Sequence, residues 1–68
     1  MGLNGTLIPA YGRDYKNKKD VEKDFRAGKD FKLMSPFGSC YCSIRDAEKG
    51  EHVQIRYNNL RSVIVVTV

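Results

Sequence analysis

The sequence has no tryptophan, one histidine, two cysteines and two prolines among its 68 residues. It also lacks any apolar stretch near the ~20 residues that a membrane-spanning helix requires, so we expect no membrane partner. Three enzyme signatures are missing as well: a glycine-rich phosphate loop before a helix, a GxSxG elbow and an HExxH pair. We therefore predict a cytoplasmic protein that is not an enzyme and needs no cofactor.

The few soft side chains offer one arrangement that suits a metal ion. Cys40 and Cys42 lie two positions apart, so on a strand their sulfur atoms face the same side, and His52 on the next strand would come within reach. A zinc site usually has a fourth ligand and a two-residue gap between its cysteines, and both are missing here. We therefore interpret both cysteines as free thiols and predict no metal.

What the sequence does have is charge of both signs. Charged residues make up 29% of the chain and apolar residues 41%, which is typical of a globular domain. The length suits a single domain covering residues 1–68. The net charge is +4, and residues 13–32 contribute +3 of it, because they hold eight basic and five acidic side chains. The positive charge is therefore local but diluted.

This basic segment has two interpretations. The first is the solvated outer face of a helix, with acidic and basic side chains paired along its surface. The second is weak, nonspecific binding of nucleic acid, for which the candidate contacts are Arg13, Lys16, Lys19, Lys23 and Arg26. Because carboxylates dilute the charge, we favour the first interpretation. We expect Tyr11 and Tyr15 to pack beneath the start of the helix, and they would stack on bases only if they face outward.

Turn residues and hydrophobic periodicity divide the chain into short elements. A helix is predicted over residues 18–27, capped by Asn17, ended by Gly28 and apolar on one side at Val21 and Phe25. Ser43 is expected to cap a helical turn. The predicted strands cover residues 6–8, 30–34, 39–43, 52–57 and 62–68. Turns are predicted at residues 35–38 and at Asn58-Asn59, the latter as a two-residue hairpin.

The order of these elements predicts the fold class. A helix follows the first strand, and four further strands follow the helix, with the short helical turn in the middle. We expect an α+β fold in which one helix packs on a small curled antiparallel sheet of about five short strands. An SH3-like small barrel is the alternative, because a barrel hides both faces of a short sheet.

The last predicted strand is apolar on both faces, which one helix cannot cover. Val63 and Val65 point to one side of the strand, whereas Ile64, Val66 and Val68 point to the other. Such a strand must lie in the centre of a curled sheet or bury its second face against another subunit. We therefore expect a homo-oligomer, with self-association through Val63, Val65, Val66 and Val68.

Three stretches of the sequence resemble a viral family. They are AYGRDYKNKK at residues 10–19, DFRAGKDF at residues 24–31 and VQIRYNNL at residues 53–60, the last followed by a valine-rich tail. This pattern resembles a small uncharacterised protein family of tailed bacteriophages and marine viral sequences, which has no assigned activity. The resemblance implies a phage-type accessory protein in the host cell cytoplasm. We expect a non-enzymatic protein-interaction module whose partner is an unidentified host or phage protein.

Overall fold

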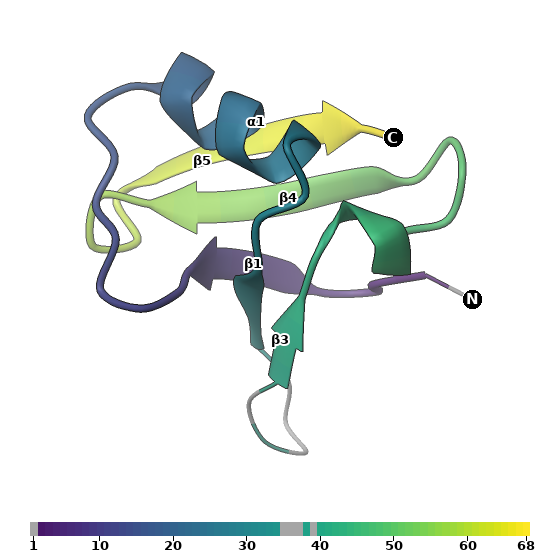
Figure 1. Ribbon diagram of the computed structural model, residues 1–68. Helices are drawn as coiled ribbons and strands as arrows, with labels where there is room; N and C mark the ends of the chain where they lie inside the picture. Colours follow the sequence, from purple (N-terminus) through teal and green to yellow (C-terminus); the bar gives the residue numbers. More distant parts are fainter. Residues whose placement is uncertain (1, 35–37, 39) are drawn as a thin grey trace.

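A computed structural model describes residues 2–34, 38 and 40–68 of the chain. In these residues a single α-helix lies across one face of a five-stranded sheet (Figure 1). The helix α1 spans Lys18–Arg26, and a one-turn 3-10 helix, η1, spans Ile44–Asp46. The strands are β1 (Thr6–Pro9), β2 (Phe31–Met34), β3 (Cys40–Cys42), β4 (His52–Tyr57) and β5 (Ser62–Thr67).

This succession of elements confirms the predicted order and the predicted α+β class. The turn predicted at residues 35–38 lies outside the described residues except for Gly38, and so does residue 39 of the third predicted strand. In the part of the chain that the structure describes, no helix has the length and apolar character needed to cross a membrane.

The sheet is mixed rather than antiparallel, which corrects the prediction. Its strand order is β3-β2-β1-β4-β5. After β3 the chain passes through η1 and returns to the other side of β1, so β4 runs parallel to β1, with Leu7 opposite Ile55. The remaining three strand pairs are antiparallel. Because β3 and β5 form two open edges, the sheet is not a barrel, and β5 is not a central strand.

α1 begins and ends close to the predicted residues. The side chain of Asn17 accepts a 3.0 Å hydrogen bond from the backbone N–H of the third helical residue, as an N-cap does. At the other end Gly28 adopts a φ of 90°, and the N–H of Lys29 donates a 3.2 Å bond to the C=O of Asp24. This Schellman ending stops the helix at Arg26 and turns the chain into β2.

The core lies between α1 and one face of the sheet. Val21 and Phe25, the apolar residues predicted for the helix, are fully buried. They share one cluster with alternate strand residues, which include Leu7, Phe31, Val53, Ile55 and Val66. The intervening strand residues point to the other side of the sheet and are exposed or half-buried. We call that side the open face.

The turn between β4 and β5 has four residues rather than the predicted two. It covers residues 58–61, and the N–H of Arg61 donates a 3.1 Å hydrogen bond to the C=O of Asn58. Asn58, Asn59 and Leu60 have φ values of 54°, 55° and 67°. Asparagine tolerates this left-handed conformation, whereas a large side chain such as that of Leu60 does so at an energetic cost.

Candidate interaction surfaces

The open face carries four of the six large apolar side chains that are exposed in the described chain. These four are Met34, Tyr41, Val63 and Val65. Each is about half exposed, from 47% to 57%. The cations Lys32 and Arg56 also lie on this face, whereas none of the described strand residues on it is a carboxylate. The exposed apolar side chains form two groups, one on β2 and β3 and one on β5, which β1 and β4 separate. Exposed apolar surface of this kind is typical of interaction sites.

The outer backbone edge of β5 is the second candidate surface. The backbone N–H of Val68 donates a 2.9 Å hydrogen bond to the C=O of Glu51, the residue before β4. The backbone groups of Val68 therefore point toward β4. This pattern alternates along an antiparallel strand, so the N–H and C=O groups of Val63, Val65 and Thr67 point outward. The outward direction of the Thr67 C=O is confirmed by the 3.2 Å hydrogen bond that it accepts from Arg26 of the helix. The described sheet has no strand beyond β5.

The four valines predicted for self-association divide into two pairs. Val63 and Val65 are 52% and 57% exposed and lie on the open face. Val66 is only 2% exposed and belongs to the core beneath α1, and Val68 packs against that core. The alternation of the strand produces this division. Only Val63 and Val65 therefore offer a surface to a second molecule.

A cleft of about 480 Å³ runs between the β5 edge and α1. It is lined by Lys18, Lys19, Glu22, Val63, Ile64 and Val65. The side chains that border it on the helix are long and charged, so their ends can move aside. The edge of β5 is therefore accessible to an added strand.

Tyr11 and Tyr41 form an exposed aromatic pair at the β3 end of the open face. Their ring centroids are 5.0 Å apart and their planes differ by 12°. Tyr11 reaches Tyr41 from the loop after β1, with a φ of 58°. Tyr11 thus faces outward, which corrects the expectation that it packs beneath the start of the helix and meets the condition for stacking. Tyr41 is a residue that we did not predict, although its alternation with the two cysteines places it on the open face, opposite Lys32 of β2.

A hollow of about 640 Å³ opens beside Tyr11. Its other lining residues are Gly28, Ser43 and four charged residues, Arg13, Lys29, Asp30 and Arg45. The hollow carries a modest excess of positive charge, because three cations and one carboxylate line it, while Arg13 and Lys29 also approach the carboxylate of Asp24 at 3.9 and 3.4 Å. It therefore suits a ligand that carries negative charge and has an aromatic part.

Arg13 differs from the other predicted nucleic-acid contacts because it points into the protein. Its guanidinium lies 4.8 Å from the centroid of the Phe31 ring, and its Nη1 atom lies 3.9 Å from a carboxylate oxygen of Asp24. It also donates hydrogen bonds to the backbone C=O groups of Ala10, at 3.1 Å, and Asp30. Arg13 thus fastens the loop after β1 to the start of β2.

The remaining predicted contacts lie on the surface of the protein. Lys16, Lys19, Lys23 and Arg26 are all exposed. Lys19, Lys23 and Arg26 border one shallow depression, as the helical spacing predicts, but Glu22 is part of it. The Nε atom of Arg26 lies 2.8 Å from a carboxylate oxygen of Glu22. Binding of nucleic acid through this stripe stays a prediction, with a carboxylate inside the stripe.

Tyr15 is buried, so it supports the fold instead of forming a surface. Its hydroxyl donates a 2.6 Å hydrogen bond to Asp24, and its ring stacks with Phe31 at 6.2 Å. Burial, followed by the bond to Asp24, raises the pKa of Tyr15 to about 12. The same bond is the main reason that the pKa of Asp24 is lowered, and the Nζ atom of Lys29, 3.4 Å away, adds to the effect.

The two cysteines lie on the helix side of β3 as free thiols. Their sulfur atoms are 3.8 Å apart. Burial, together with the neighbouring thiol of Cys40, raises the pKa of Cys42 to about 11. The thiolate is the reactive form of cysteine, so Cys42 is a poor nucleophile near neutral pH.

His52 does not lie near the cysteines, which corrects the prediction that it occupies the next strand. It begins β4, and β2 and β1 separate β4 from β3. Its side chain also lies on the open face, where Nδ1 is 3.0 Å from the hydroxyl of Thr67. Among the described residues, no three His, Cys, Asp or Glu side chains are grouped so that they could hold a metal ion.

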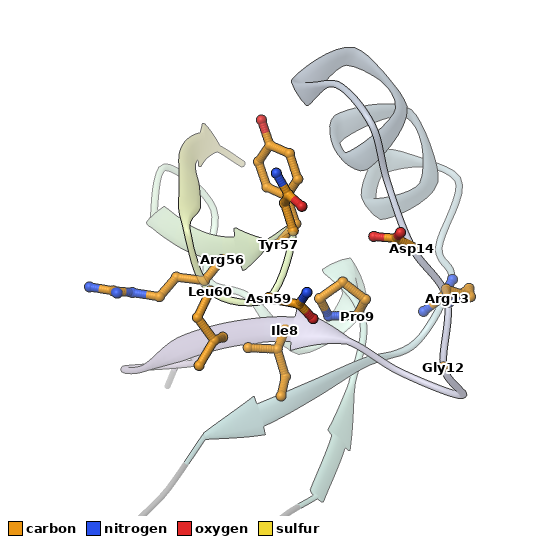
Figure 2. A pocket seen from close by; sticks show the side chains of 10 residues that line it. Ile8, Pro9, Gly12, Arg13, Asp14, Arg56, Tyr57, Asn59 and Leu60 are labelled. Atoms are coloured by element: carbon orange, nitrogen blue, oxygen red, sulfur yellow. The ribbon is translucent and has the colours of Figure 1, made fainter.

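A further cleft, of about 490 Å³, opens where the parallel strands β1 and β4 end (Figure 2). Ligands of α/β proteins often bind at such strand ends. Figure 2 shows Ile8 and Leu60 on one side of this cleft and Arg56 pointing away from it. Asp14, from the loop after β1, accepts a 2.9 Å bond from the next backbone N–H. One carboxylate oxygen of Asp14 is therefore already hydrogen-bonded within its own loop.

Comparisons of the chain with protein-family models, with curated proteins and with solved structures find no match. The resemblance to a phage family stays a prediction. The assignment of function therefore depends on the surfaces described above.

Proposed function

We propose that this chain is a non-enzymatic protein-interaction module that assembles with a second copy of itself through the outer edge of β5. The observation that carries the proposal is this edge, with Val63 and Val65 exposed beside it. The strand has the sequence SVIVVT, without charge, proline or glycine. Protective charges and prolines normally prevent a sheet edge from adding another strand, and β5 has neither.

A second copy fits this edge because antiparallel pairing of a strand with itself is symmetric. A two-fold axis perpendicular to the sheet and passing beside Ile64 places Val63 of each copy opposite Val65 of the other. These are the residues whose N–H and C=O groups point outward, so four hydrogen bonds form. The bond between Arg26 and Thr67 remains intact, because Thr67 lies beyond the paired region.

The same register also matches the side chains. On the open face, Val63 of one copy lies beside Val65 of the other, so the exposed apolar surface of both is covered. On the helix face, Ile64 lies beside its own counterpart. None of these strand side chains is charged, and the charged side chains that border the edge, Lys18, Lys19 and Glu22 of α1, are of both signs. The result is a continuous sheet with both helices on one side.

Disulfide trapping tests this arrangement directly. In a Cys40→Ser/Cys42→Ser background, Ile64→Cys places two cysteines at a non-hydrogen-bonded pair, where Cα atoms are about 4.5 Å apart and a disulfide can form. Thr67→Cys on the same strand is the matched control, because its counterpart lies about 20 Å away in this register. We expect covalent dimers on mild oxidation only for Ile64→Cys. Equal trapping of both variants, or of neither, contradicts the proposal.

A further inference from the structure

We propose that the Tyr11–Tyr41 pair and the hollow beside it bind single-stranded nucleic acid, with a base stacked on the tyrosines and phosphates at Lys29 and Arg45. This goes beyond self-assembly, because the site lies at the β3 end of the sheet whereas assembly uses β5 at the other edge. The two activities can therefore be tested independently.

The geometry of the tyrosine pair supports base stacking. Tyr11 is 70% exposed and Tyr41 is 55% exposed, and their nearly parallel rings leave their outer faces for a ligand. Exposed aromatic rings bind bases of any sequence, because every base has a π face. Tyr11 is also held at a φ of 58°, which is unfavourable for a large side chain. Backbone strain of this kind is concentrated at binding sites.

The cations around the pair are placed for the phosphate backbone. Lys29 and Arg45 are exposed and line the hollow that Tyr11 borders. Lys29 lies 3.4 Å from the carboxylate of Asp24, so a phosphate there would share Lys29 with this carboxylate, whereas Arg45 forms no ion pair among the described residues. Lys32 lies opposite Tyr41 on the open face. The hollow also contains Asp30, so we expect two or three phosphate contacts rather than many. Positive charge thus lies on both sides of the stacking surface.

Single strands fit these features better than the alternatives. Bases inside a duplex are paired and stacked on one another, so they cannot reach the tyrosine rings. An acidic peptide would contact the cations but has no base to place on the tyrosines. Stacking and phosphate contacts require no 2′-hydroxyl, so we expect DNA and RNA single strands to bind alike.

Fluorescence anisotropy with labelled oligonucleotides of about 12 nucleotides tests the proposal. The probes are oligothymidylate, oligouridylate, an abasic strand and a duplex of equal length, at salt concentrations of about 50 and 200 mM. We expect both single strands to bind more tightly than the abasic strand and the duplex. Two or three phosphate contacts predict a log–log salt dependence of about −1.4 to −2.

Variants locate the site. Tyr11→Ala and Tyr41→Ala should each weaken binding of the single strands by about 5- to 100-fold, and Tyr11→Phe should retain it. Lys19→Gln/Lys23→Gln, which removes exposed charge from α1, is the matched control and should weaken binding far less. Circular dichroism checks that each variant is folded.

Several results would overturn the proposal. They are absence of binding at the lower salt, equal affinity for the abasic strand, and full affinity in folded Tyr11→Ala. If an alanine variant does not fold, amide chemical shifts of the wild-type protein decide instead. Oligothymidylate should perturb the signals of Tyr11, Tyr41 and Arg45, and perturbations confined to α1 would place the site elsewhere.

Discussion

The hydroxyl of Tyr15 donates a 2.6 Å hydrogen bond to Asp24 and so ties the loop after β1 to the middle of α1. The nearby guanidinium of Arg13 approaches the same carboxylate. Arg13, Tyr15 and the helix cap Asn17 of the stretch YGRDYKNKK are thus structural, whereas Tyr11 turns outward to Tyr41. The stretch therefore combines a structural attachment with an exposed aromatic surface, and neither part depends on its lysines.

This attachment predicts a loss of stability in alkali. The pKa of Tyr15 is raised from 10.0 to about 12, so the folded protein holds the phenolic proton more tightly than the unfolded chain. Its contribution to stability is complete below pH 10 and is lost as the pH rises from 10 through about 12. Urea unfolding at about pH 9 and 11 should show a smaller loss in Tyr15→Phe than in the wild-type protein. An identical loss would contradict this role.

Two carboxylates predict a loss of stability in acid. Glu51 accepts bonds from the backbone N–H groups of Glu48, at 2.8 Å, Asn4 and Leu3, and these bonds lower its pKa below 4.5. The bond from the tyrosine hydroxyl lowers the pKa of Asp24 below 3.8. Both groups hold their protons less tightly in the folded state, so their stabilisation is present above about pH 4.5 and is lost as the pH falls. Unfolding curves of Glu51→Gln should depend less on acid than those of the wild-type protein, and an unchanged dependence would refute this account.

Local signals in the sequence predict the elements well. Asn17 and Gly28 define α1 because capping and the left-handed stop depend only on neighbouring backbone groups. Ser43 caps η1 for the same reason. The strict alternation of residues 52–57 predicts which side chains of β4 enter the core, and the burial pattern confirms it. The same two-residue alternation places Val63 and Val65 on the open face and Val66 in the core.

The arrangement of distant segments could not be predicted in this way. Nothing local to β4 specifies that it lies parallel to β1, and this pairing moves His52 away from Cys40 and Cys42. The stacking of Tyr11 on Tyr41 joins residues that are 30 positions apart. Likewise, which face of the sheet α1 covers and which face stays open depends on the packing of the whole sheet.

The left-handed conformation of Leu60 predicts a stabilising substitution. Its φ is 67° and its side chain is 47% exposed, so it stores strain with little compensating burial. Leu60→Gly should raise the free energy of unfolding by about 1 kcal/mol, because glycine adopts this conformation without strain. The neighbouring Arg61→Gly is the matched control, and it should be neutral or destabilising. Thermal unfolding of both variants measures the difference, and destabilisation by Leu60→Gly would contradict the prediction.

The two faces of β5 predict different effects for two adjacent valines. Val66→Thr should lower the free energy of unfolding by about 1–2 kcal/mol, because Val66 is buried under α1. Val65→Thr should leave the stability of the monomer nearly unchanged and weaken self-assembly, because Val65 is exposed. Chemical unfolding of dilute protein measures the first effect, and sedimentation at several concentrations measures the second. The reverse assignment of the two effects would exclude assembly through β5.

Static light scattering at micromolar concentration tests the central claim, self-assembly through the edge of β5, most directly. The proposed pairing predicts a mass of twice the 7.7 kDa of one chain for the wild-type protein. Val65→Lys places a charge at the pairing edge and should return the mass to that of the single chain. Gln54→Lys, on the open face of the neighbouring strand, should leave the dimer intact. A wild-type mass of 7.7 kDa would contradict the account.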